Sequence, residues 1–195
     1  MNQQYTKNKG QSPFQYLLAL QAAVRMNRQT APAPAAPTGE WAGVMFRSGD
    51  QVLLTPLTEV NEILRVDLLA PVPGVKTWVR GMTTNRGELF PVTDLQGFLN
   101  KKLSVLTSRS RILMTNFQEG FAGILVDRVL GLQYIPLASW NDKILSEYPA
   151  LAPFMIGSFT NENFTIPIIS HYAMIQHPRF RDVALREEEI GGVGP

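Results

Sequence analysis

The 195-residue sequence contains no cysteine. This absence excludes disulfide bonds, thiolate nucleophiles and zinc sites with cysteine ligands. No apolar run approaches the roughly 20 residues that a membrane-spanning helix requires. The short apolar stretch at residues 17–20 is soon followed by Gln21 and Arg25, which is unlike the core of a secretory signal. We therefore expect a cytoplasmic protein with no direct membrane insertion.

Residues that carry catalysis are also scarce. The two histidines, His171 and His177, have no acidic cluster near them in the sequence, and HExxH, nucleophile-elbow and phosphate-loop motifs are absent. Asp94, Asp127 and Asp142 are isolated, as aspartates that cap helices or hold turns usually are. We expect no enzymatic activity, no cofactor and no metal site.

An excess of one charge is likewise missing, since the net charge is only +2. Residues 1–40 carry four basic groups against one acidic group, and residues 41–195 carry fourteen against fifteen. The second part therefore offers no strong field for phosphates. A candidate basic face comprises Lys76, Arg80, Arg86, Lys101, Lys102, Arg109 and Arg111. Its nearest aromatic residues, Trp78 and Phe90, alternate as core residues do, so single-strand nucleic-acid binding is the weaker alternative and we expect no nucleic-acid partner.

The N-terminal 39 residues read as an extension. Ser12, Pro13 and Gln15 form a helix start, and an amphipathic helix is predicted over residues 13–28 with Phe14, Leu17, Leu18 and Val24 on one face. The Ala/Pro stretch at residues 31–37 then favours an extended linker. A helix this short is marginal alone, so its apolar face needs a partner, either the protein's own domain or another protein.

Beyond the linker, strand and turn signals dominate. Each of four segments has two short apolar or β-branched runs around a polar turn, which is typical of a β-hairpin. The predicted hairpins join Val44–Arg47 to Gln51–Thr55, Val79–Thr84 to Glu88–Val92, Arg111–Phe117 to Phe121–Val126, and Met155–Thr160 to Phe164–Ile169. Only short helices are expected besides these, over Thr93–Lys102 and Arg179–Glu189. The sequence predicts a mostly β protein.

The hairpins repeat along the chain. Residues 79–92 align without gaps on residues 155–168 at an offset of 76, and the preceding hairpins align at an offset of 69. Two such matches in the same order favour an internal duplication. We expect two small β-barrel subdomains, at about 40–108 and 109–177 of a domain spanning 40–178, followed by a tail at 179–195. Barrels of short strands would leave few exposed sheet edges.

Four segments in order resemble the CheW-like adaptor domain of bacterial chemosensory systems, over roughly Val44 to Met174. The segment Phe46–Asp50 leading to Leu57–Ile63 resembles the family's opening hairpin and its V-x-E-I segment. Trp78–Leu95 is similar to the signature P-x-x-x-x-G-V-x-N-L-R-G-x-x-x-P-V-x-D-L, with Thr84 and Asn85 in place of its Asn-Leu. Gly123–Val129 and Phe154–Gly157 resemble the family's G-L-L-V-D-x-V and F-I-x-G.

The resemblance implies two intertwined, five-stranded, SH3-like barrels without catalytic activity. Such adaptors join the cytoplasmic tip of a methyl-accepting chemoreceptor to the regulatory domain of a chemosensory histidine kinase, at membrane-bound receptor arrays. The N-terminal helix, the linker and Glu40–Gly43 look most like the adaptors of the type IV pilus twitching-motility branch. A partner-binding module in another signalling assembly is the alternative.

The resemblance also implies a receptor-binding site. Arg86 matches the family's receptor-linked arginine, and Val60 and Glu62 match neighbours in the same groove. Asn85 and Gly87 form the turn that presents Arg86, since asparagine and glycine tolerate positive φ. Val60 and Ile63 could equally belong to the core. Exposed apolar side chains at the hairpin edges are expected to supply the binding energy.

Overall fold

A computed structural model describes residues 39–117, 120–142, 144–160 and 164–185 of the chain. One sheet has six strands in the order β8-β1-β2-β11-β10-β9, and the other has five in the order β3-β6-β7-β5-β4. The six-stranded sheet comprises β1 (Glu40–Ser48), β2 (Gln51–Pro56), β8 (Arg128–Pro136), β9 (Trp140–Asn141), β10 (Met155–Thr160) and β11 (Thr165–Ile169). The five-stranded sheet comprises β3 (Glu62–Arg65), β4 (Val79–Asn85), β5 (Glu88–Asp94), β6 (Arg111–Phe117) and β7 (Gly120–Val126).

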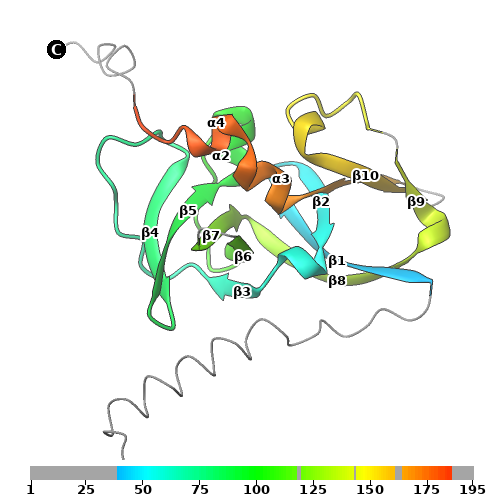
Figure 1. Ribbon diagram of the computed structural model, residues 1–195, viewed down its shortest axis with the longest axis horizontal. Helices are drawn as coiled ribbons and strands as arrows, with labels where there is room; N and C mark the ends of the chain where they lie inside the picture. The colour runs from blue at the N-terminus through cyan, green and yellow to red at the C-terminus, as the bar shows by residue number, and fades with distance from the viewer. Residues whose placement is uncertain (1–38, 118–119, 143, 161–163, 186–195) are drawn as a thin grey trace, which may run out of the picture. The chain divides into compact units, whose positions relative to one another are not determined.

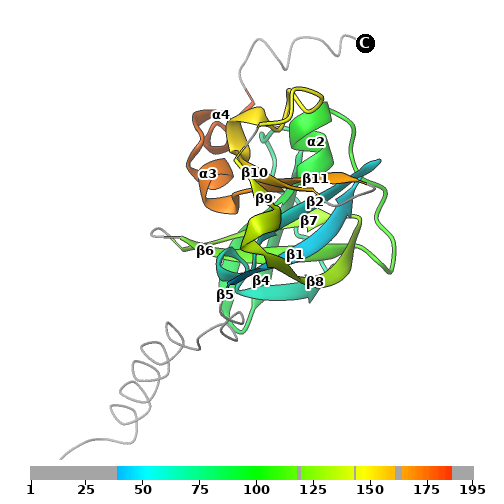
Figure 2. The same cartoon turned by 90° about the vertical axis from the view of Figure 1, so that its right-hand side faces the viewer.

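The helices are short. They are α2 (Leu95–Asn100), α3 (His171–Gln176) and α4 (Pro178–Arg181), with the 3-10 turns η1 (Leu57–Glu59), η2 (Leu137–Ser139) and η3 (Ala152–Phe154). Figures 1 and 2 show α2, α3 and α4 gathered on one side of the sheets. The predicted extension at 1–39, with its helix at 13–28, lies outside the described residues except for its last residue, Gly39.

The structure confirms all four predicted hairpins, as β1–β2, β4–β5, β6–β7 and β10–β11. The predicted C-terminal helix, in contrast, is shorter than expected. α4 ends at Arg181, and the next residues pair with a distant segment: Ala184 bridges Val75, and the Leu185 N–H donates to the Gly74 carbonyl over 2.9 Å. Since this tertiary partner satisfies the backbone groups, the described residues after Arg181 have no need of helix.

The predicted repeat is visible in the strand register. β1 and β2 pair Gly43 with Pro56, and β6 and β7 pair Ile112 with Leu125, which is the same pair 69 residues later. In each sheet, one strand of this hairpin also pairs in parallel with a strand of another hairpin: β2 with β11 in the first sheet, and β7 with β5 in the other. Leu54 faces Ile168 in the first sheet and Gly123 faces Val92 in the other, at offsets of 69 and 76. The two sheets are therefore built on one plan.

The two copies of the repeat exchange hairpins. The hairpin β1–β2, from the start of the chain, lies between β8 and β11 in the six-stranded sheet. The hairpin β6–β7 lies between β3 and β5 in the five-stranded sheet. The chain thus crosses between the sheets after Pro56 and again after Val126. The predicted intertwining is present, but the predicted boundary near residues 108–109 does not separate the sheets. Local hairpin signals identify each pair of strands and carry no information on which distant pair it joins.

The predicted closed five-stranded barrels are in fact two sheets whose strand orders do not close on themselves. After β3, the backbone pairs with the opposite edge of the sheet at an isolated bridge between Ala70 and Met82 of β4. Pro71 follows Ala70 directly and has no N–H group with which to extend the ladder. In the other sheet, the corresponding segment forms the two-residue strand β9 beside β10. The five-stranded sheet is therefore a half-barrel with a seam between β3 and β4.

The hydrophobic core has three parts. The largest contains residues of both sheets and of the helices, including Phe46, Leu113, Phe98, Phe154 and Phe180, and it joins the two halves. Two smaller clusters belong to one sheet each: Phe90, Val92, Ile112, Met114 and Leu125 in the five-stranded sheet, and Leu54, Ile135, Ile166 and Ile168 in the six-stranded sheet. Both sheets are consequently buried on both faces near their centres.

The three isolated aspartates accept structural hydrogen bonds, and Asp94 is the predicted helix cap. Asp94 is fully buried and caps α2, accepting hydrogen bonds from the Gly97 N–H at 3.1 Å and the Ser104 N–H at 2.8 Å. Asp127 accepts from the Gly49 N–H over 2.7 Å, and Asp142 accepts from the Trp140 indole over 2.6 Å.

Candidate functional site

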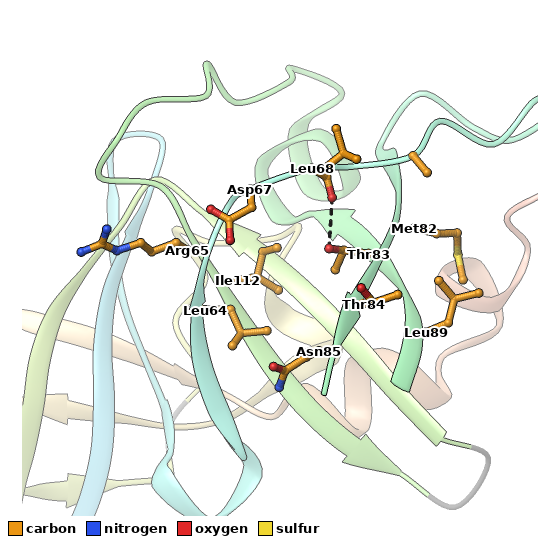
Figure 3. A pocket seen from close by; sticks show the side chains of 11 residues that line it. Leu64, Arg65, Asp67, Leu68, Met82, Thr83, Thr84, Asn85, Leu89 and Ile112 are labelled. Carbon is orange, nitrogen blue, oxygen red and sulfur yellow. Dashed lines mark hydrogen bonds between the residues drawn. The ribbon is translucent and has the colours of Figure 1, made fainter. Parts of the chain in front are cut away.

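The seam of the half-barrel forms a groove of about 370 Å³. Its walls are β3 and the segment after it on one side, and β4 on the other, with Ile112 of β6 between them (Figure 3). The Ala70–Met82 bridge and a 3.1 Å hydrogen bond from the Thr83 hydroxyl to the Leu68 carbonyl join the two walls. The groove therefore lies where two edge strands of one sheet approach each other.

The turn between β4 and β5 stands at the edge of this groove. Asn85 and Glu88 form the last pair of the hairpin, and Arg86 and Gly87 between them have φ angles of +50° and +85°. Positive φ at both central residues defines a type I′ turn, which matches the twist of the strands. The sequence favoured Asn85 as a residue with positive φ, but Arg86 takes that conformation together with Gly87. A left-handed conformation costs a non-glycine residue roughly 1–2 kcal/mol.

Glu62, the first residue of β3, binds two neighbouring side chains of this turn. Its Oε1 accepts a hydrogen bond from Arg86 Nη2 at 2.8 Å, and its Oε2 accepts one from Asn85 Nδ2 at 2.5 Å. Asn85 Nδ2 also lies 3.7 Å from the sulfur of Met114. The carboxylate thus ties the tip of the β4–β5 hairpin to the opposite edge of the sheet. We call Glu62, Asn85 and Arg86 the seam clamp.

The seam clamp contributes little to stability. The Arg86 side chain is 60% exposed and that of Glu62 29% exposed, and exposed ion pairs are worth about 0–1 kcal/mol. Its main effect is on geometry, because it holds a solvent-exposed guanidinium at a defined place beside the groove. Only Nη2 of that guanidinium bonds to Glu62, which leaves further N–H donors for another molecule.

The remaining candidate residues divide between the turn and the core. Gly87 belongs to the turn and has open space around it. Val60 packs against the main core cluster and is not among the residues that line the groove. Ile63, which is 39% exposed, faces outward instead. The structure therefore brings Glu62, Asn85 and Arg86 together and places Val60 against the main core cluster.

Two exposed leucines complete the site, and the sequence did not single them out. Leu68 is 82% exposed and Leu89 is 63% exposed, and both line the groove (Figure 3). The signal for Leu89 was available, because it alternates with the buried Phe90 on β5 and must therefore face away from the core. Leu68 lies in an irregular segment with no such periodicity. Exposed apolar side chains beside a fixed charge are typical of a protein-binding surface.

The aromatic residues considered for base stacking and the two histidines have structural positions. Trp78 and Phe90, the candidates for base stacking, are buried in the core. His171 is completely buried against the Thr115 hydroxyl at 3.1 Å, and burial lowers its pKa to about 3. His177 accepts a hydrogen bond from the Arg179 N–H at the start of α4. In the described residues, no three His, Cys, Asp or Glu side chains are grouped to hold a metal ion.

None of the helices in the described ranges is both long enough and apolar enough to cross a membrane.

Comparisons with known proteins agree with this architecture. Residues 42–179 match the model of the CheW-like domain family. The chain is 37% identical over 175 residues to Protein PilI of Pseudomonas aeruginosa, covering 90% of this chain and 98% of that protein. It is 41% identical over 93 residues to Protein FrzA of Myxococcus xanthus, covering 48% and 58% of the two chains.

More distant similarity extends to CheW itself. The chain is 30% identical over 116 residues to the chemotaxis protein CheW of Rhizobium meliloti, covering 60% of this chain and 72% of that one. The crystal structure of the scaffolding protein TtCheW from Thermoanaerobacter tengcongensis superposes with a TM-score of 0.61 at 20% identity, covering 74% and 92% of the chains. At that identity the superposition supports the fold alone. Together with the match over residues 42–179, these relatives show that the chain belongs to the CheW-like domain family, a family of non-enzymatic scaffold proteins.

Proposed function

We propose that this protein couples a methyl-accepting chemoreceptor to a chemosensory histidine kinase in the control of type IV pilus twitching motility. The observation that carries this proposal is the seam clamp, which presents the exposed Arg86 beside a partly apolar groove. The 37% identity to PilI over nearly the whole of both chains supports the pilus-related branch.

The groove suits the cytoplasmic tip of a receptor. Leu64, Leu68, Met82 and Leu89 offer apolar surface along the groove, and burial of such surface would supply most of the binding energy. Arg86 would contribute a charge-assisted hydrogen bond to a carboxylate of the receptor, which fixes orientation more than affinity. Glu62 acts as a positioning residue, because its carboxylate accepts a hydrogen bond from the Arg86 guanidinium and so fixes where that group lies.

The kinase partner follows from the family resemblance. The regulatory domain of such kinases has the same fold, and a second surface of this adaptor would bind it. The protein would then work on the cytoplasmic side of the membrane, recruited to receptor arrays through its partners.

Charge reversal at Arg86 tests the receptor site. We expect Arg86→Glu to repel Glu62 and to weaken binding of a purified chemoreceptor cytoplasmic fragment about tenfold or more, since a charge-assisted hydrogen bond is worth roughly 1.5–3 kcal/mol. Binding of the kinase regulatory domain, measured in parallel, should not change. The control is Lys102→Glu, an equal change of charge at an exposed residue outside the groove. Wild-type receptor affinity in Arg86→Glu would remove Arg86 from the site.

Affinity purification from the native host separates this function from its alternatives. Recovery of a chemoreceptor and a histidine kinase supports the coupling role. Recovery of a different signalling assembly would favour a partner-binding module with the same fold. Trp78 and Phe90, the candidates for base stacking in single-strand nucleic-acid binding, are buried in the core. The absence of a gel shift at low salt would discard that function, because phosphate contacts are strongest there.

A further inference from the structure

A second pocket, with no residue in common with the groove, lies where the ends of β1 and β8 meet the loop before β6. It has a volume of about 360 Å³. Its lining is strongly basic and consists of Arg47, Thr107, Ser108, Arg109, Asp127 and Arg128. Arg109 belongs to the candidate basic face of the sequence, and the proposed coupling function uses none of these six residues.

Two of the arginines lie opposite each other on adjacent strands. In the antiparallel register of β1 and β8, Arg47 is directly opposite Arg128. Like charges in this position repel and destabilise a strand pair. The Nε atoms of both side chains are buried and have no hydrogen-bond partner. Buried donors are normally paired, because an unsatisfied donor inside a protein is unfavourable. The pair therefore carries a like-charge repulsion that an anion beside the two guanidinium groups would relieve.

The protein itself supplies too little negative charge to relieve this repulsion. Among the described residues, no carboxylate forms an ion pair with Arg47, Arg109 or Arg128. Asp127 is the one acidic residue of the lining, and its Oδ2 accepts the Gly49 N–H at 2.7 Å. Three guanidinium groups against one carboxylate leave a local charge of +2.

The third arginine is carried by an ordered turn. Arg111 Nη1 donates hydrogen bonds to the carbonyls of Ser108 and Ser110, at 2.9 and 2.7 Å. The Thr107 N–H donates to the Ser110 hydroxyl over 3.0 Å, and the Arg109 N–H donates to the Thr107 hydroxyl over 3.2 Å. These contacts fix the backbone around Arg109, which lines the pocket.

We propose that this pocket binds a phosphate group, either as free phosphate or as the phosphate monoester of a small molecule. A phosphate monoester carries a charge of about −1.5 to −2 at neutral pH, which balances the local +2, whereas one carboxylate balances only half of it. Guanidinium groups match phosphate oxygens in fork geometry, and the Ser108 hydroxyl adds a neutral donor. The bound group would lie against the exposed parts of the guanidinium groups and end the repulsion between Arg47 and Arg128.

Titration calorimetry with the full-length protein at low chloride tests the site, with inorganic phosphate as the probe. We expect saturable binding that becomes about tenfold weaker in Arg47→Gln and in Arg128→Gln, the loss of one charge-assisted contact. Lys102→Gln removes a positive charge outside the pocket and should bind as the wild type does. Arg109→Gln changes only the exposed loop, so it remains informative if the strand variants do not fold.

Two further probes identify the source of the phosphate. Tighter binding of adenosine 5′-monophosphate than of inorganic phosphate indicates an ester ligand, and weaker binding indicates the free anion; either result supports the site. The proposal is overturned if millimolar phosphate does not bind saturably, or if the arginine variants bind it as the wild type does. Tighter binding of succinate than of phosphate also overturns it, because the pocket then recognises carboxylates. None of these outcomes depends on receptor or kinase binding.

Discussion

Glu62 and Arg86 form a 2.8 Å ion pair that joins the two edges of the five-stranded sheet across its seam. Glu62 begins β3, and Arg86 lies 24 residues later in the turn after β4. The contact is exposed, so it defines where the guanidinium lies and contributes little to the free energy of unfolding.

Exchanging the charges of Glu62 and Arg86 separates the effect of the ion pair on stability from its effect on receptor binding. Glu62→Arg and Arg86→Glu should each lower the free energy of unfolding by less than about 1 kcal/mol, and the double variant should regain part of that loss. The double variant should not regain receptor binding, because its positive charge now lies on β3. Urea unfolding and receptor-fragment affinity are the measurements. Full recovery of affinity in the double variant would show that the ion pair matters and the position of the arginine does not.

Gly81 is expected to be among the least replaceable residues of the fold. Its φ is +132°, and a Cβ there would lie 2.4 Å from the Ala70 carbonyl oxygen, where the seam is bridged. Gly81→Ala should destabilise the protein by about 2 kcal/mol or more, through both strain and this clash. Gly87→Ala is the control, since Gly87 also has positive φ but open space around it, and should cost about 1 kcal/mol. Equal losses of unfolding free energy in the two variants, measured with urea, would mean that the backbone around Ala70 adjusts to a Cβ at position 81 without cost.

His171 should make the protein sensitive to acid. Burial lowers its pKa from an ordinary value of 6.5 to about 3. Between these values the unfolded chain binds a proton that the folded chain does not, so stability falls as the pH drops through this range. The slope is at most about 1.4 kcal/mol per pH unit.

His171→Asn tests this, because it removes the titrating group and keeps a hydrogen-bonding partner for Thr115. The variant should lose less stability than the wild type between pH 6.5 and pH 4. Burial also raises the pKa of Glu59, which works in the opposite direction: stability from its protonated form is lost as the pH rises. Both proteins share that contribution, so their difference isolates His171. Identical pH profiles in thermal unfolding would contradict the assignment.

Deletion of residues 1–38 should leave the β domain folded. Residues 39–185 contain the three hydrophobic clusters within their described ranges, and burial of such clusters is the main source of stability. We expect the melting temperature of the 39–195 fragment to stay within a few degrees of the full-length value, the shift that about 1 kcal/mol produces. A large fall would mean that Phe14, Leu17 and Leu18 pack on the domain.

Much of the fold could be predicted because its signals are local. The Asn85–Gly87 turn between alternating apolar residues defines a hairpin without help from the rest of the chain, and so does Ser48–Asp50. The family motifs around Gly81, Arg86 and Asp127 likewise identified the adaptor domain. The strand β8 was missed because its exposed positions are themselves apolar, as at Leu130, Leu132 and Tyr134, so burial does not alternate with residue type.

Local patterns in the chain were enough to predict the β class, the four hairpins, the duplication and the turn that carries Arg86. The exchange of hairpins between the duplicated halves, the contact of Glu62 with Arg86 and the position of Arg47 opposite Arg128 emerge in the folded molecule. This difference reflects the range of the interactions. A turn depends on the φ angles of adjacent residues, whereas sheet pairing and side-chain contacts depend on which distant surfaces the chain buries together.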